Sequence, residues 1–85
     1  MLTAADHQAL TEARAYLRTL PPVSKNIKLG MRVDVVPKSV VVSGESVEVE
    51  GQWEYFVAIE TVHTCHSWAR GDTLTLVIKE CLLGL

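Results

Sequence analysis

The spacing of hydrophobic residues changes near Pro21, and the change divides the chain into two kinds of segment. Before that point the apolar side chains recur every three or four residues, namely at Ala9, Leu10, Ala13, Tyr16, Leu17 and Leu20. This is the period of a helix with one buried face. From Leu29 onward apolar and polar residues alternate, as in a half-buried strand. The pattern therefore predicts one N-terminal helix followed by strands.

The predicted helix covers about residues 3–20 and has signals at both ends. Thr3 can act as the N-cap, and Asp6 three residues later completes a capping box. Pro21 and Pro22 end the helix, because proline lacks an amide proton and disfavours the helical conformation of the residue before it.

The predicted strands are shorter segments bounded by turn residues. They cover about residues 29–36, 39–42, 46–50, 53–64 and 73–81, with turn signals at Pro37-Lys38, Ser43-Gly44, Gly51-Gln52 and Arg70-Gly71. Short connections favour antiparallel neighbours. We therefore expect an α+β fold in which one helix packs on a four- or five-stranded antiparallel meander, either open or curled into a small barrel.

Composition limits the class of protein. The chain has 85 residues, of which 48% are hydrophobic, with three prolines and five glycines, so we expect one folded domain, residues 1–85. No apolar stretch approaches the length of a membrane span or a signal-peptide core. Two cysteines are too few for the disulfide framework of a small secreted protein, which favours a cytoplasmic location.

The net charge of −2 conceals two opposed blocks of charge. Residues 39–69 contain five acids and no lysine or arginine, and the acids are Glu45, Glu48, Glu50, Glu54 and Glu60. Residues 14–38 contain six bases and one acid. The acids could form an ordinary solvated sheet face, or a surface that docks on a basic partner and stands in for nucleic-acid phosphates. The basic block could also pair with the acidic face of a second copy.

Two apolar features point to contacts with a partner. Trp68 is predicted in a polar loop beside Arg70, where it is either tucked over the sheet edge or a contact anchor, since both residue types often carry the binding energy of protein interfaces. The chain ends in an apolar tail with Leu82, Leu83 and Leu85, whereas chain ends are usually frayed. The tail packs either in the core or against a neighbour, and we expect a homo-oligomer.

The segment with His63, Cys65 and His66 contains three side chains that could bind zinc or form a Cys–His pair. On an extended strand His63 and Cys65 share one face and His66 points the other way. In the predicted hairpin Cys81 would lie about 20 Å from Cys65. We therefore predict no metal site and no cofactor, and interpret Cys65 as a thiol in the core.

These features rank three functions. The first is a non-enzymatic protein-interaction module, such as an inhibitor, adaptor or assembly subunit of the kind that phages and mobile elements encode. Its expected contact residues are Glu48, Glu50, Glu54, Glu60, Trp68, Arg70, Leu82, Leu83 and Leu85. The alternative is a small-molecule or zinc site, catalytic or not, at His63, Cys65 and His66. The third is a nucleic-acid-binding small barrel that stacks bases on Trp53 and Tyr55, ranked last because the chain is acidic.

Overall fold

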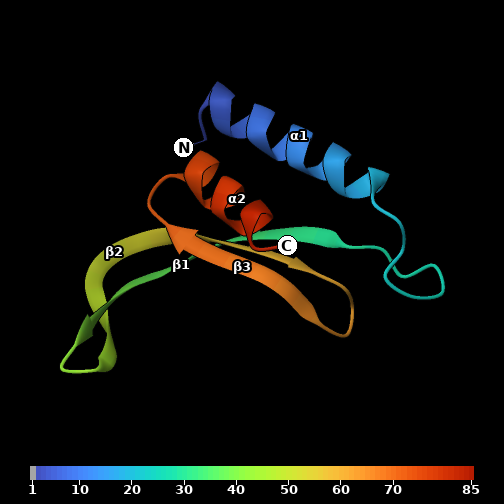
Figure 1. Ribbon diagram of the computed structural model, residues 1–85. Coiled ribbons are helices and arrows are strands. Elements are labelled where there is room, and N and C mark those ends of the chain that lie inside the picture. The colour runs from blue at the N-terminus through green and yellow to red at the C-terminus, as the bar shows by residue number, and fades with distance from the viewer. Residues whose placement is uncertain (1) are drawn as a thin grey trace.

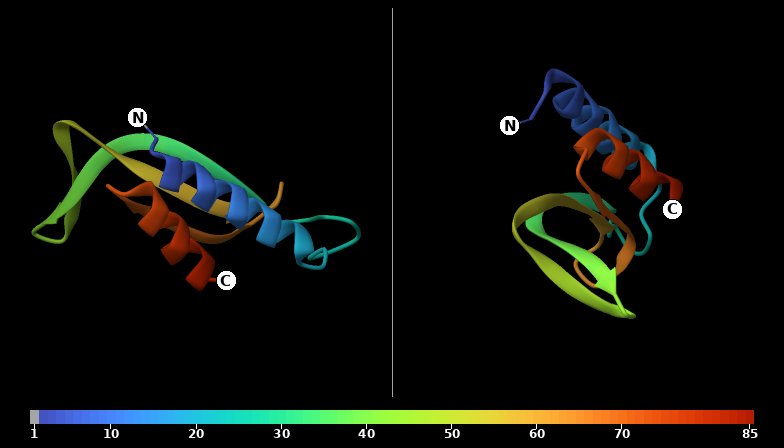
Figure 2. Two further views of the ribbon diagram at one scale, coloured as in Figure 1. Left: turned by 90° about the horizontal axis from the view of Figure 1, so that it is seen from above. Right: turned by 90° about the vertical axis from the view of Figure 1, so that its left-hand side faces the viewer.

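A computed structural model describes residues 2–85 and shows an α+β fold with two helices on one face of a three-stranded sheet (Figures 1 and 2). The elements are α1 (Ala4–Thr19), β1 (Gly30–Val42), β2 (Glu45–Glu60), β3 (Cys65–Gly71) and α2 (Leu74–Leu83). The sheet is antiparallel with the order β1-β2-β3. The predicted α+β class is confirmed, whereas the prediction of four or five strands or a barrel is wrong. Within residues 2–85 neither helix has the length and apolar character needed to cross a membrane.

The predicted first helix is confirmed together with its cap. The Thr3 hydroxyl accepts from the Asp6 amide and the Asp6 carboxylate accepts from the Thr3 amide, both at 3.1 Å. The helix ends at Leu20, whose backbone is extended, directly before Pro21. Asp6 has a second role, because its other carboxylate oxygen accepts from the Thr75 hydroxyl at 2.6 Å and from the Thr75 amide at 3.2 Å. This side chain therefore ties the start of α1 to the start of α2.

The predicted last strand, residues 73–81, is wrong, because this segment forms α2. Leu74, Leu76 and Ile78 alternate as in a strand, yet the same stretch also has apolar residues at helical spacing. The buried residues are Leu74, Val77, Ile78 and Cys81, whereas Leu76 is exposed. Packing against α1 and the sheet thus selects the helical period over the strand propensity of valine, isoleucine and threonine.

Four predicted strands merge into two long ones. The predicted interruptions at Pro37-Lys38 and Gly51-Gln52 lie opposite each other, so β1 and β2 bend together instead of ending. Pro37 pairs with Trp53 and Ser39 pairs with Glu48, which leaves Lys38 opposite the four residues 49–52. Gly51 has a positive φ of 73° within this bulge, a conformation that glycine adopts without steric cost.

The strand β3 was predicted as a polar loop. It pairs with the end of β2, and the connection is a turn in which the Thr61 hydroxyl accepts from the amides of His63 and Thr64, both at 3.1 Å. This turn has no glycine, proline, asparagine or aspartate, so the pattern predicted a strand through residue 64. Arg70-Gly71 leads from β3 toward α2 and does not join two strands.

The core lies between the helices and one face of the sheet. Its buried members are Leu10, Ala13, Leu17, Val57, Ile59, Ala69, Leu74, Val77, Ile78 and Cys81. In the described part of the chain, residues 2–85, the opposite face of the sheet has no helix over it (Figure 2). The fold therefore leaves three surfaces for contacts: this open face, the outer side of the helices and the far end of the β1–β2 hairpin.

Candidate interaction surfaces

The far end of the β1–β2 hairpin, residues 39–50, projects from the body as a two-stranded arm (Figure 1). Strand β3 pairs only with Tyr55–Glu60 and stops short of the arm. The arm ends in the turn Ser43-Gly44, where both residues have positive φ angles of 52° and 82°. This is the turn geometry that two-residue hairpins prefer, so the predicted turn at this position is confirmed.

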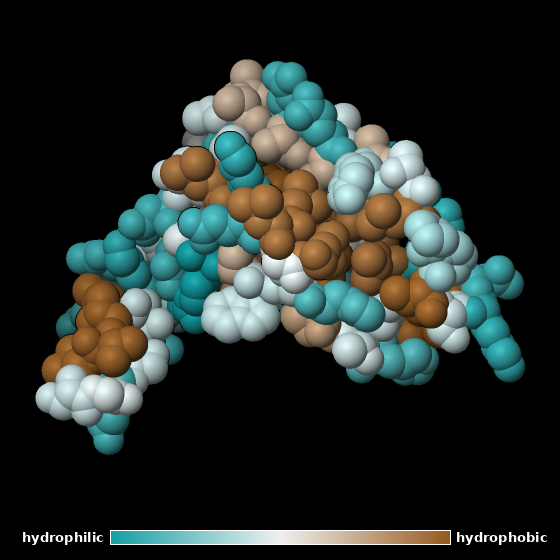
Figure 3. All heavy atoms as spheres, in the orientation of Figure 1, coloured by the Kyte–Doolittle hydropathy of each residue, from teal (hydrophilic) through white to brown (hydrophobic). Residues whose placement is uncertain are grey.

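One side of the arm is apolar and uncovered. Val40 and Val47 are a cross-strand pair, and Val42 lies two residues further along the same side. Val40 is 42% exposed, Val42 is 54% exposed and Val47 is 46% exposed. Figure 3 shows apolar atoms gathered on the arm, separated by hydrophilic residues from the apolar area over the helices. An isolated two-stranded ribbon is only marginally stable in water, so a partner that covers this side would stabilise it.

The charged side chains of the arm are all acidic. They are Glu45, Glu48 and Glu50, all of which are exposed. Within residues 2–85 none of them forms a salt bridge. Of the acids in residues 39–69, those of the arm are therefore exposed and outside the salt bridges of residues 2–85.

The other two predicted contact acids are occupied within the sheet. Glu54 is only 8% exposed, and its carboxylate accepts from the Arg70 guanidinium at 2.5 Å. Glu60 accepts from Arg32 at 2.9 Å, and Arg32 also pairs with Asp34. Because these carboxylates already have cationic partners, their charges are balanced within the sheet.

Arg70 and Trp68 belong to the open face of the sheet. Arg70 also donates to the Pro37 carbonyl at 2.9 Å, so its guanidinium crosses the sheet from β3 to β1. Trp68 is 59% exposed and stacks on Phe56, with ring centroids 5.9 Å apart. The Arg32 guanidinium also lies over the Phe56 ring, 5.5 Å from its centroid. Trp68 thus remains accessible, but on a strand rather than in a loop.

A second charged surface runs from the second half of α1 into the loop that follows it, away from the arm. It consists of Arg14, Arg18, Lys25 and Lys28, which we call the basic end. All four are exposed, and none forms a salt bridge within residues 2–85. In Figures 1 and 2 the end of α1 and the following loop lie far from the arm, and the longest dimension of the molecule is 42 Å.

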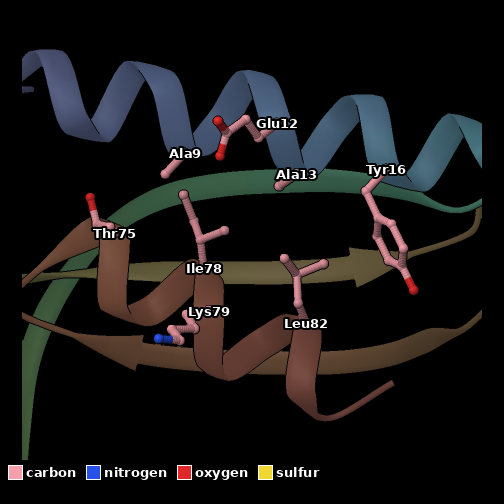
Figure 4. A pocket seen from close by; sticks show the side chains of 8 residues that line it. All are labelled: Ala9, Glu12, Ala13, Tyr16, Thr75, Ile78, Lys79 and Leu82. Carbon is pink, nitrogen blue, oxygen red and sulfur yellow. The ribbon is translucent and has the colours of Figure 1, made fainter.

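The helices leave a shallow apolar groove of about 330 Å³ between them (Figure 4). Ile78 and Leu82 of α2 point toward Ala9 and Ala13 of α1, and Tyr16 stands at one end of the groove. The predicted apolar tail is divided by this packing. Leu82 is half-buried at the core, whereas Leu83 and Leu85 are 78% and 48% exposed.

His63, Cys65 and His66 lie at the β2–β3 turn and are all exposed. Within the part of the chain that the structure describes, no three side chains of His, Cys, Asp and Glu come together as metal ligands would. The interpretation of Cys65 as a core thiol is wrong, because its position on the edge strand β3 leaves it in solvent. The buried cysteine is Cys81, whose pKa is raised by burial.

The predicted distance between the two cysteines is also wrong, because it assumed that residues 73–81 form a strand. The Ser67 hydroxyl donates to the Cys81 carbonyl at 2.6 Å, so Cys81 packs beside β3, two residues from Cys65 along that strand. Both thiols are free.

The arm valines are the surface residues that the sequence reasoning missed. They were interpreted as ordinary strand residues in a sheet of four or five strands. The available signal was a run of three valines, residues 40–42, and the alternating valines of residues 47–49, on the two sides of the turn Ser43-Gly44. It could not show that no third strand covers them.

The comparisons with known proteins are negative. No protein-family model matches the chain, no curated protein matches it, and no solved structure matches it.

Proposed function

We propose that this protein is a non-enzymatic protein-interaction module that docks through its arm. The observation that supports the proposal is that the arm combines an uncovered valine side with exclusively acidic charges. Apolar contact supplies affinity at an interface, and charge of one sign selects a partner of the opposite sign and speeds the encounter. Glu45 lies across from Val42 on the valine side, whereas Glu48 lies across from Ser39 on the other side of the arm. A partner that meets the valine side with an apolar patch and reaches around the arm with basic side chains fits both features.

The proposal differs from the one based on sequence in the residues that carry it. Glu54 and Glu60 are excluded because they pair with Arg70 and Arg32, and substituting them would disturb the sheet itself. The acids assigned to the proposed contact are Glu45, Glu48 and Glu50. The apolar residues assigned to it are Val40, Val42 and Val47. Trp68 lies on the separate open face, where we assign it no part in this contact.

The test is a quantitative capture experiment with matched variants. Immobilised wild-type protein is compared with Glu48→Gln/Glu50→Gln and with the control Glu12→Gln/Glu80→Gln in a lysate of the native host. Both double variants remove two exposed acids that form no salt bridge within residues 2–85. We expect partners to be lost about tenfold with the arm variant and retained with the control. Equal capture by both would show that the arm acids do not dock.

A second variant tests the apolar side. Val40→Thr/Val47→Thr keeps the β-branched shape and strand propensity but adds a hydroxyl to each side chain. We expect the same partners to be lost, because burial of these side chains would then desolvate unpaired hydroxyls. Retention of the partners would limit the contact to the acids and contradict the proposed role of the valine side.

A further inference from the structure

We infer that the partner of the arm is a second copy of this chain, whose basic end receives it. The inference rests on the proposed function, because it names the partner of the same surface. It follows from the distribution of charges that remain unpaired once the salt bridges of the sheet are counted.

The sheet neutralises its own charges. Arg32 pairs with Asp34 and Glu60, Lys38 pairs with Asp72, and Arg70 pairs with Glu54. Within residues 2–85 the bases of residues 14–28 and the acids of residues 45–50 form no such pair. The molecule therefore presents two charge surpluses of opposite sign, one at each end.

The two surfaces cannot neutralise each other within one molecule. The loop of residues 20–29 and the arm lie at opposite ends of a body whose longest dimension is 42 Å (Figures 1 and 2). The longest dimension is several times the Debye length at physiological ionic strength, which is about 8 Å, so charges at the two ends are screened from each other. Contact between opposite charges therefore requires two molecules.

The basic end also offers an apolar contact for the valine side. Val23 is 46% exposed and lies two residues before Lys25 in the sequence. Its amide donates to the Ile27 carbonyl at 2.8 Å, so the segment forms a tight turn of its own. An exposed valine next to bases in this turn complements the arm, which carries exposed valines and acids. The same chain thus carries both halves of one interface.

The test is a charge exchange between two variants. The arm variant is Glu45→Lys/Glu48→Lys/Glu50→Lys, and the end variant is Arg14→Glu/Arg18→Glu/Lys25→Glu. Lys28 is kept because its ammonium donates to the Arg18 carbonyl at 3.2 Å. Circular dichroism spectra and unfolding midpoints identify any variant that fails to fold. If the arm variant fails to fold, the variant Glu45→Gln/Glu48→Gln/Glu50→Gln replaces it.

Sedimentation velocity at low ionic strength gives the mass of each species. We expect wild type to associate with increasing concentration and to dissociate in about 0.5 M NaCl, which screens exposed charges. Each charge-reversed variant alone should associate about a hundredfold more weakly, because like charges then face each other. An equimolar mixture should associate again, since the basic arm meets the acidic end and the acidic arm meets the basic end. Glu80→Lys, a reversal outside both surfaces, should behave as wild type.

Three outcomes overturn the inference. They are a wild-type chain that stays monomeric at low salt, a variant that associates as well as wild type, and a mixture that stays monomeric. Failure here is distinct from failure of the proposed function, because a monomeric chain whose arm still captures a foreign protein retains the docking role. A chain that neither associates nor shows arm-dependent capture loses both.

Discussion

Asp6 links two segments that are far apart in the sequence. One carboxylate oxygen caps α1, and the other accepts from the hydroxyl and amide of Thr75. The Thr75 hydroxyl, followed by the Thr3 amide, lowers the pKa of Asp6 below its ordinary value of 3.8. The capping role was predictable from the local pattern. The bond to Thr75 was not, because it joins residues 69 positions apart and depends on α2 being a helix.

The lowered pKa of Asp6 predicts an acid-sensitive contribution to stability. A carboxyl group whose folded pKa lies below its unfolded pKa contributes fully above the unfolded value. That contribution is then lost as the pH falls through the folded value. We expect the free energy of unfolding to decrease below about pH 4. Urea unfolding between about pH 2.5 and 7 measures this loss.

The variant Asp6→Asn separates this contribution from the rest of the acid response. It should be less stable than wild type at pH 7, and the difference should shrink as the pH falls below the ordinary pKa of the carboxyl. A constant difference across the whole pH range would contradict the role of the Asp6 charge.

At the scale of elements, local pattern predicted α1 and the Ser43-Gly44 turn but misplaced the last third of the chain. The stretch that forms α2 satisfies both a strand period and a helix period, and only the position of α1 above the sheet decides between them. The β2–β3 turn lacks the residues that usually mark turns, so the missing signal hid both β3 and the open face with Trp68. The arm was predicted as two strands, but its exposure depends on where β3 stops.

The arm turn predicts opposite effects of two substitutions. Gly44→Val places a β-branched residue at a φ of 82°, which costs about 1–2 kcal/mol. Ser43→Asn supplies a residue that this turn type favours at its first position. In hydrogen exchange by NMR we expect arm amides to exchange about tenfold faster in Gly44→Val, and more slowly in Ser43→Asn. The amides of Val57 and Ile59 should be unchanged in both, and faster exchange there would indicate that the arm and body unfold together.

At the scale of the whole molecule, one core joins both helices to the sheet. Ile59 of β2 is fully buried in the cluster that includes Leu17 of α1 and Val77 of α2. The elements of the body should therefore unfold in a single transition. The composition predicted one domain but not this arrangement, since residues 73–81 were assigned to the sheet.

Substituting Ile59 tests whether the two helices and the sheet share one core. Ile59→Val should lower the free energy of unfolding by about 1 kcal/mol, whereas Val62→Ala, at an 86% exposed position, should change it by less than about 0.5 kcal/mol. Far-ultraviolet circular dichroism follows the helices, and the fluorescence of Trp53 and Trp68, which lie on β2 and β3, follows the sheet. The unfolding midpoints measured by the two signals should shift together. Separate shifts would show that the helices and the sheet unfold independently.

The bulge at residues 49–52 also affects how this chain can change over evolution. A one-residue insertion or deletion in a regular strand moves every following side chain to the opposite face. Here four residues already oppose Lys38, so a change of length in that segment is absorbed locally, before the pairing of Tyr55–Glu60 begins. The arm can therefore gain or lose residues and acquire new partners while the body retains its register, which makes the hairpin a module that selection can alter separately from the fold.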